Sequence, residues 1–371
     1  MAELYFDHHA ATPLDPRVRA VMDEARSRPL GNPASPHAPG RRARALLERA
    51  RAQVASAVGA SPAEVMFTSG GTEACNLGVL GLAHGGHVVT TAIEHPAVAE
   101  PTRVLAHAGA RVTVLPVLGG VLPDEAIVLG ALAEHAGLLA MQWVGHETGI
   151  VLPVARWCAL AADRGAFAFV DATQALGKVA IDFPSSGATA LALASHKIGG
   201  PAGAGALVVR RGITIEPRIL GGAQERGLRA GTPDVVAAVG FGAACERLGE
   251  RLAAQAAIGA RRDRLEAFLV ARGARVNGAA ERVATVTDVS LAGWTSQALV
   301  AALDLEGLAV ASGAACSSGV DRPSAVVAAM FPEEPARASS AIRLSLGPET
   351  RDEDVDRALA IFDRVLARPP A

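Results

Sequence analysis

The chain has 371 residues, enough for a large domain with a smaller one attached. Half of the residues are hydrophobic, 19% are charged and 4% are aromatic, which is typical of a folded α/β protein and excludes a disordered one. The formal net charge of −2, with arginines spread along helix-like segments, argues against nucleic acid as a partner.

No apolar run approaches the ~18 residues of a membrane span, and residues 1–7 lack the features of a signal peptide. We therefore expect a cytoplasmic protein without a membrane partner. The four cysteines are Cys75, Cys158, Cys245 and Cys316. Because they are widely spaced and form no CxxC pair, the sequence indicates neither a disulfide framework nor a zinc site.

Short apolar runs alternate with helix-like stretches from about residue 63 to residue 209. The runs that we expect to be strands are residues 64–68, 87–91, 111–116, 138–144, 166–171, 190–194 and 205–210. Strands that are apolar on both sides and separated by helices predict a parallel sheet covered on both faces. The expected fold class is α/β, with a doubly wound, mostly parallel sheet.

The pattern changes in the last third of the chain. Residues 245–271 have the periodicity of one long helix that leaves the large domain. A strand over 283–291, a helix over 296–306, a strand over 341–346 and a helix over 351–367 are expected after it. This order predicts a smaller C-terminal α+β domain. With the boundary near Arg251, residues 14–250 form the large domain, and residues 1–13 and 251–371 form the small one.

Lysine is rare in this chain, which contains only Lys178 and Lys197. Lys197 follows the apolar run 190–194 and precedes a glycine-rich turn, and ligands of open α/β sheets lie at such strand ends. A surface lysine is the ordinary interpretation. The scarcity of lysine and the neighbouring Ser195 and His196 favour a lysine that forms a Schiff base.

Two other strand ends carry candidate groups. Asp171 ends the run 166–171, where it could cap a helix or keep a pyridinium nitrogen protonated. The turn over residues 68–73 is rich in glycine and opens a helix, so its backbone N–H groups and the Thr72 hydroxyl could bind a phosphate. The turn matches neither a Walker loop nor a dinucleotide fingerprint.

His95 follows the strand expected over residues 87–91 and could offer a flat face to a cofactor ring, although it could equally be an ordinary loop residue. The histidine pairs at positions 8–9 and 84–87 have no third ligand at a suitable spacing, and His146-Glu147 lacks the second histidine of a metalloprotease motif. We therefore expect no metal site.

Cys316 lies in a run of small residues, 312–319, with no apolar neighbours to bury it. Free cysteines are usually buried in the core, as we expect for Cys158 and Cys245. An accessible thiol fits a nucleophile or a sulfur carrier.

Together these segments resemble the cysteine desulfurases of the class V aminotransferase family, which are fold type I enzymes that use pyridoxal 5′-phosphate (PLP). The segments that carry the resemblance are residues 5–13 (YFDHHAATP), 31–37, 67–76 (FTSGGTEACN), 94–95, 171–178 (DATQALGK), 195–205 (SHKIGGPAGAG), 221–232 (GGAQERGLRAGT), 312–319 (SGAACSSG) and 341–347. Any one of them could arise by chance, but their order along nearly the whole chain is specific.

The resemblance implies a homodimeric enzyme that takes sulfur from L-cysteine, leaves L-alanine and passes a Cys316 persulfide to an acceptor protein for iron-sulfur clusters or thiolation. The implied cofactor contacts are Lys197 as the Schiff base, Asp171 at the ring nitrogen, Gln174 at the phenolic oxygen, His95 on the ring, Gly71, Thr72 and His196 at the phosphate, and Thr232 at the phosphate of the other subunit. Arg343, with Asn32, is implied as the clamp for the substrate carboxylate.

The chain departs from the family pattern at several positions. Gly145 and His146 replace two asparagines, and His146 is expected to take over a cofactor contact. Ala194 replaces a serine, with Ser195 one place later as a candidate phosphate ligand, and Val170 stands where histidine is common. These departures leave open a scaffold without turnover. Another PLP enzyme (an aminotransferase, or a selenocysteine or C–S lyase) is the second alternative, from which the Cys316 thiol distinguishes a desulfurase.

Overall fold

The computed structural model describes residues 3–133, 135–278, 281–313 and 323–368, and it confirms the doubly wound α/β fold. In its described part, the largest sheet has seven strands in the spatial order β2 (Val65–Thr68), β8 (Gly205–Val209), β7 (Ala190–Ala194), β6 (Phe167–Asp171), β5 (Ala136–Gln142), β3 (His87–Thr91) and β4 (Val112–Leu115). Strands β3 to β7 run parallel, and β8 is antiparallel to both of its neighbours. The predicted strands differ from these only at their ends.

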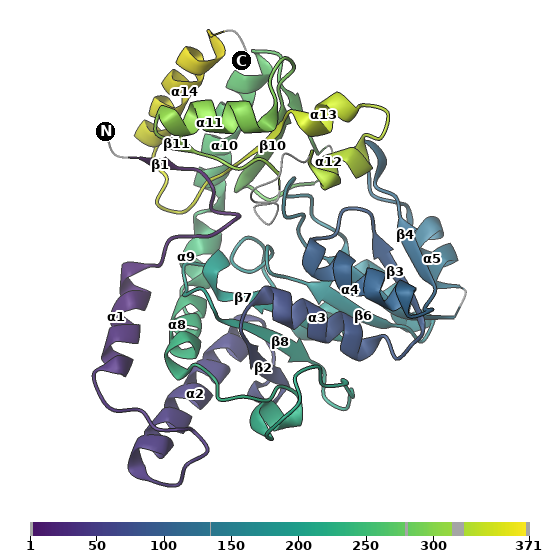
Figure 1. Ribbon diagram of the computed structural model, residues 1–371, viewed down its shortest axis with the longest axis vertical. Helices are drawn as coiled ribbons and strands as arrows, with labels where there is room; N and C mark the ends of the chain where they lie inside the picture. The colour runs from purple at the N-terminus through teal and green to yellow at the C-terminus, as the bar shows by residue number, and fades with distance from the viewer. Residues whose placement is uncertain (1–2, 134, 279–280, 314–322, 369–371) are drawn as a thin grey trace.

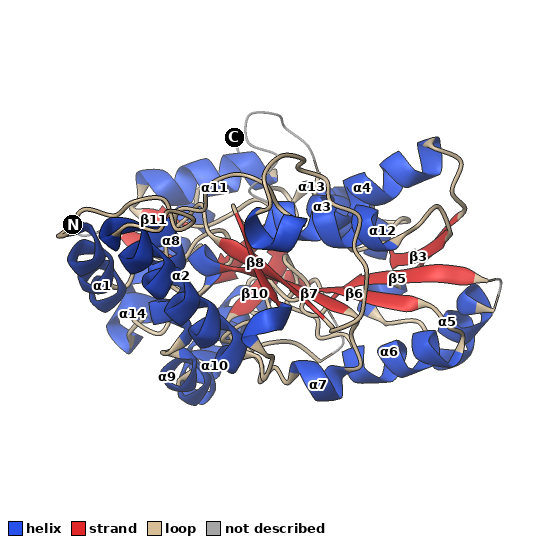
Figure 2. Ribbon diagram, turned by 90° about the horizontal axis from the view of Figure 1, so that it is seen from below, coloured by secondary structure: helices blue, strands red, loops and turns tan. Residues whose placement is uncertain are grey.

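Helices cover both faces of this sheet (Figures 1 and 2). One face carries α3 (Gly71–Leu82) and α4 (Pro96–His107), and the other carries α5 (Glu125–Leu132), α6 (Val154–Asp163) and α7 (Phe183–Ser186). Successive side chains of β6 point to opposite faces. Phe169 packs with the buried cluster under α3, whereas Ala168 and Val170 pack in the core on the other face. Burial on both faces explains why the strands read as continuous apolar runs.

Three helices pack together beside the sheet: α1 (Pro16–Arg26), α2 (Ala38–Ala57) and α8 (Val235–Cys245). The prediction of one helix over residues 245–271 is wrong, since α8 is followed by α9 (Leu248–Ala253) and α10 (Gln255–Val270). Arg247 leaves helical geometry (φ −100°, ψ 5°), and its side chain binds Asp15 (2.9 Å) and Glu250. The break therefore depends on a tertiary contact.

The C-terminal part forms a smaller α+β unit, as predicted. Its sheet has the order β12 (Ala341–Ser345), β10 (Val286–Ser290) and β9 (Arg275–Val276), and a separate pair joins β1 (Leu4–Tyr5) to β11 (Leu308–Ala309). Its helices are α10, α11 (Ser296–Leu305), α12 (Ala325–Met330), α13 (Pro335–Ser339) and α14 (Asp352–Leu366). Short 3-10 turns are η1 (Pro62–Glu64), η2 (Leu118–Gly120), η3 (Ser195–Lys197) and η4 (Gln224–Gly227).

The N-terminal segment packs with this smaller unit. Leu4 and Phe6 share a buried cluster with side chains of α10, α11 and α14. Val283 and Met330, in contrast, pack in the core of the larger unit, so the division near Arg251 stays a prediction. In the described part of the chain, no helix is both long enough and apolar enough to cross a membrane.

Candidate active site

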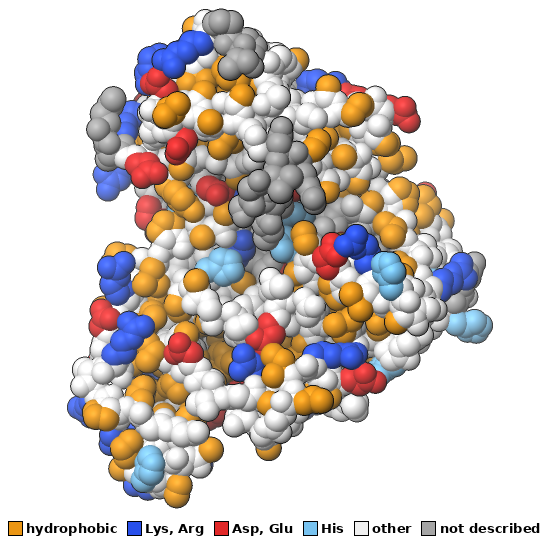
Figure 3. All heavy atoms as spheres, viewed as in Figure 1, with side chains coloured by type: hydrophobic (Ala, Val, Ile, Leu, Met, Phe, Trp, Pro, Cys, Tyr) orange, Lys and Arg blue, Asp and Glu red, His pale blue; other side chains and the backbone are white. Residues whose placement is uncertain are grey.

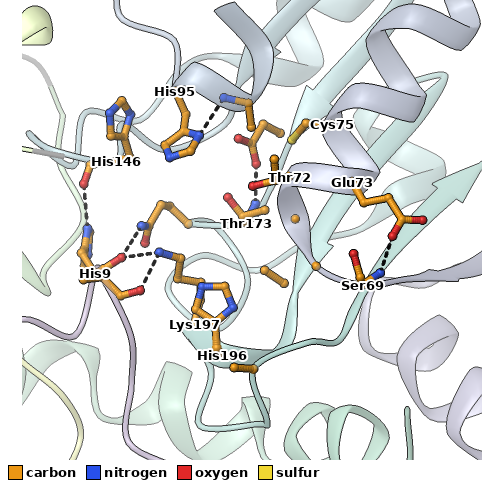
Figure 4. A pocket seen from close by; sticks show the side chains of 18 of the residues that line it. His9, Ser69, Thr72, Glu73, Cys75, His95, His146, Thr173, His196 and Lys197 are labelled. Atoms are coloured by element: carbon orange, nitrogen blue, oxygen red, sulfur yellow. Dashed lines mark hydrogen bonds between the residues drawn. The ribbon is translucent and has the colours of Figure 1, made fainter. Parts of the chain in front are cut away.

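A cavity of about 350 Å³ lies at the carboxyl ends of the parallel strands, within the usual size of a small-molecule site. Its lining includes nine of the residues predicted for the site: Gly71, Thr72, His95, His146, Asp171, Gln174, His196, Lys197 and Arg343. All of them except Arg343 lie at or after the ends of different strands of the large sheet, and parallel strands end at the same edge of a sheet. Figure 4 shows the cavity from close by, and Figure 3 shows histidine and basic side chains in the hollow at the centre of one face.

The amine of Lys197 is held at the wall of this cavity by the N-terminal segment. Lys197 Nζ donates hydrogen bonds to the carbonyl oxygens of His9 (2.5 Å) and Ala10 (3.0 Å) (Figure 4). In the sequence His9 stood out only as a candidate metal ligand. Its contribution here comes from the backbone carbonyl, which leaves no signature in the sequence.

Gln174 connects the two lysines of the chain. Its Nε2 donates to the His9 carbonyl (2.8 Å), and its Oε1 accepts from Lys178 Nζ (2.8 Å). In its charged form Lys178 can only donate, and it then fixes which end of the Gln174 amide carries the N–H groups. Burial, with repulsion from Lys197 and two arginines, holds the pKa of Lys178 well below its ordinary value. No motif in the sequence indicates this role of Lys178, although lysine is scarce in the chain.

The N-terminus of α3 opens into the cavity. Gly70, the residue before the helix, has a positive φ of 155° and, as a glycine, has no side chain to cap the helix. The amides of Gly71 and Thr72 make no hydrogen bond with a described residue, so they are available to an anion. A Cβ on Gly71 would lie 2.6 Å from the Thr173 side chain, which explains the glycine. His196 lines the same cavity, and burial lowers its pKa to about 4, so the ring is neutral near pH 7.

Asp171 is buried at the end of β6, and its Oδ1 accepts the backbone N–H of Thr173 (2.9 Å). Several ionisable groups lie close enough to be affected by its charge, among them Cys75, Glu94 and His95. Burial and the Asp171 carboxylate raise the pKa of the Cys75 thiol well above its ordinary value. Burial, with a smaller contribution from Asp171, raises the pKa of Glu94 to about 8. Glu94 is therefore mostly protonated at pH 7.

Two histidine rings lie edge to face across the cavity, with the centroids of His95 and His146 4.9 Å apart. His95 Nδ1 accepts the backbone N–H of Ala97 (3.0 Å) at the start of α4, so the neutral ring carries its hydrogen on Nε2. His146 Nδ1 lies 3.3 Å from Gln142 Oε1. Burial is the largest cause that lowers the pKa of both histidines, so both rings are neutral at physiological pH.

Arg343 of β12 closes another side of the cavity and is 2% exposed. Its Nη2 donates to Asp7 Oδ1 (2.8 Å), its Nη1 donates to the His146 carbonyl oxygen (2.9 Å), and its buried Nε has no partner among the described residues. A guanidinium fork at this place has the geometry to bind a carboxylate.

Four predicted site residues do not lie in this cavity. Asn32 lies in the loop between α1 and α2 and accepts a backbone N–H of that loop (2.9 Å). Ser195 is fully buried, with its Oγ packed against Gly200. Thr232 lines a separate cavity of about 180 Å³. Cys316 lies outside the described residues.

Of the departures from the family pattern, His146 and Ala194 line the cavity, whereas Val170 is buried in the core. Among the residues that the structure describes, no three His, Cys, Asp or Glu side chains are grouped in a way that could hold a metal ion.

Comparison with known proteins gives consistent matches along the whole chain. The family model described as aminotransferase class V matches residues 4–358. An IscS-like cysteine desulfurase of Mycobacterium tuberculosis is 38% identical, with 98% of this chain and 96% of that protein covered. A cysteine desulfurase of Bradyrhizobium diazoefficiens is 37% identical, with 99% and 95% covered.

Two solved structures match the fold over nearly its full length. A NifS-like protein superposes with a TM-score of 0.92 at 30% identity, covering 98% of this chain and 99% of that one. A NifS-like protein from Rickettsia africae gives a TM-score of 0.90 at 28% identity, covering 99% and 100%.

Proposed function

Because this chain belongs to the class V aminotransferase family, and within it to the cysteine desulfurases, we propose that the cavity at Lys197 holds PLP and takes L-cysteine as its substrate. The resemblance noted in the sequence is confirmed for the family. The activity is that of a PLP-dependent cysteine desulfurase. The observation that carries the proposal for the site is the Lys197 amine, held by two backbone carbonyls inside a cavity that also contains Asp171, His95 and Arg343.

The residues present fit PLP. The free amides of Gly71 and Thr72 at the N-terminus of α3 suit its phosphate, and Asp171 supplies a carboxylate for its ring nitrogen. The amide of Gln174 is oriented by Lys178 so that its N–H groups face the His9 carbonyl and the cavity. When bound, PLP withdraws electrons from the Cα of an amino acid, so the Cα proton becomes acidic.

Lys197 is the group of this chain that can take the Cα proton. Its Nζ is fixed by the carbonyl oxygens of His9 and Ala10, so its lone pair can be directed once the amine is neutral. His95 is neutral and carries its hydrogen on Nε2, so it is a second group in the same cavity that can donate a proton. Arg343 binds the substrate carboxylate and so fixes which bonds of the substrate face Lys197.

The segment that carries Cys316 begins and ends beside the cavity. A Cβ on Gly313 would lie 3.6 Å from both carboxylate oxygens of Glu147, and Ser324 Oγ donates to the same carboxylate. Glu147 directly follows His146, which lines the cavity. We therefore assign the sulfur-accepting role to Cys316. The Cys316 sulfur attacks the sulfur of L-cysteine, the substrate C–S bond breaks, and the products are L-alanine and a Cys316 persulfide.

We also propose a sulfur acceptor, an oligomeric state and a cellular location for this enzyme. The persulfide is passed to an acceptor protein, for iron-sulfur cluster assembly or thiolation, and the enzyme is a cytoplasmic homodimer. Thr232 does not line the active-site cavity of its own chain but lines a neighbouring one, which suits a residue that completes the phosphate site of the partner subunit.

The experiment measures L-alanine and protein-bound persulfide formed from L-cysteine by the holoenzyme. Lys197→Ala is expected to form neither, and Cys316→Ala is expected to form no protein persulfide and little alanine. Cys158→Ala, which changes a buried core thiol, is the matched control and keeps both products. Alanine and persulfide formation that persists in Lys197→Ala or in Cys316→Ala contradicts the assignment.

A further inference from the structure

A second, much smaller cavity shares Lys197 with the active site. Its volume is about 20 Å³, which is room for one water molecule or one ion of similar size. It lies where the N-terminal segment, the end of β7, helices α9 and α10 and the segment after β12 meet. Its polar lining residues include His8, Lys178, Lys197, Arg251 and Gln255.

The basic groups around this cavity have more donors than partners. Arg251 is 9% exposed, and its guanidinium makes no hydrogen bond or ion pair with any described residue. Lys178 Nζ donates to one partner among the described residues, Gln174 Oε1, although it carries more than one N–H group in either protonation state. His8 Nδ1 is buried without a partner in the described part of the chain. Burial, followed by repulsion from Arg251 and Lys178, lowers the pKa of His8 to about 4.

No carboxylate among the described residues lines the cavity to balance these charges. Asp15, a buried acid whose charge acts on Arg251, is already paired with Arg17 and Arg247. Burial lowers the pKa of Arg251. The charge of the exposed Glu349 opposes this shift, without an ion pair between the two side chains. Buried charges without a partner are strongly disfavoured in proteins, so the cavity has the electrostatic character of an anion site.

We propose that the cavity between Lys178 and Arg251 binds one monatomic monovalent anion, with chloride as the physiological occupant. The anion neutralises two basic side chains that have unfilled donors, in a space too small for phosphate or sulfate. It also keeps Lys178 charged and so preserves the orientation of the Gln174 amide next to Lys197. One acceptor, Gln255 Oε1, is also unpartnered, so a water molecule is the other possible occupant and the test separates the two.

The solution test measures the melting temperature Tm of the holoenzyme as chloride replaces gluconate at constant ionic strength. The proposal predicts a saturable rise of about 2 °C or more in the wild type. The rise is lost in Arg251→Met and in Lys178→Met. It is kept in Arg264→Met, the matched control, because Arg264 pairs with Asp352 and Asp356 on the surface. A Tm that does not respond to chloride in the wild type, or an equal response in Arg251→Met, overturns the proposal.

A crystal of the holoenzyme soaked in sodium bromide gives an independent answer that does not require any variant to fold. Bromide is expected as an anomalous peak in the cavity, within contact distance of Lys178 and Arg251. A water peak without anomalous signal overturns the proposal. A bromide peak without a chloride-dependent Tm is binding at crystal concentration only, and it also overturns the proposal.

Discussion

Replacement of Arg343 by lysine tests whether this side chain binds the substrate carboxylate. Arg343 uses Nη1 and Nη2 for two separate partners, the His146 carbonyl oxygen at 2.9 Å and Asp7 Oδ1 at 2.8 Å. A lysine amine cannot span both places and present a fork to a carboxylate. The Arg343→Lys variant therefore loses at least one charge-assisted hydrogen bond to the substrate.

The size of the effect follows from the contribution of such a bond. A hydrogen bond to a charged group contributes about 1.5–3 kcal/mol, and each ~1.4 kcal/mol is a factor of ten in rate. We expect kcat/KM for L-cysteine to fall roughly 10- to 150-fold, mainly through a higher KM, because the carboxylate contact is present in the bound substrate as well as in the transition state. The assay is initial-rate alanine formation over a range of L-cysteine concentrations.

Asp7→Asn is the matched control, since it weakens the same partly buried contact without removing the guanidinium. Both variants are expected to lose stability, but only Arg343→Lys raises KM. If kcat/KM of Arg343→Lys stays within about threefold of the Asp7→Asn value, Arg343 does not bind the carboxylate.

Three further variants test other parts of the structure. Arg51→Met leaves the buried Glu225 carboxylate without its ion-pair partner. We expect the free energy of unfolding to fall by about 3–5 kcal/mol. A loss below ~1 kcal/mol, measured by urea unfolding, contradicts this expectation. Burial raises the pKa of Glu94 to about 8 in the folded state, from an ordinary value of 4.5. Its contribution to stability therefore decreases as pH rises between these two values, by at most ~1.4 kcal/mol per pH unit. Glu94→Gln should flatten this pH dependence, and an unchanged profile would show that Glu94 ionises normally. Lys178→Met frees the Gln174 amide to turn. The Kd of the apoenzyme for PLP, measured by equilibrium dialysis, is therefore expected to rise roughly tenfold. Equal affinity in the variant and the wild type would mean that Lys178 does not orient Gln174.

The large sheet could be predicted from the sequence because its strands are buried on both faces. β7 is fully buried along its length, and the run of alanine and leucine shows this directly. The break between α8 and α9 could not be predicted, because neither a glycine nor a proline stands at Glu246 or Arg247, where the helix ends and the next begins. It depends on the contact of Arg247 with Asp15, which is distant in sequence.

The candidate site was predictable where a side chain follows a strand. Asp171 and Lys197 were found by this rule, and both line the cavity. The role of His9 was missed because it acts through its carbonyl oxygen. Glu94 was missed as a proton-bearing group because its pKa depends on burial and on Asp171, which only the folded chain brings near.

The most direct test of the central claim is to reduce the holoenzyme with borohydride, which fixes PLP to the lysine that holds it, and to map the modified peptide by mass spectrometry. The chain contains only two lysines, so the result is unambiguous. We predict the modification on Lys197 alone. Modification of Lys178, or a protein purified with added PLP that carries none, would contradict the account.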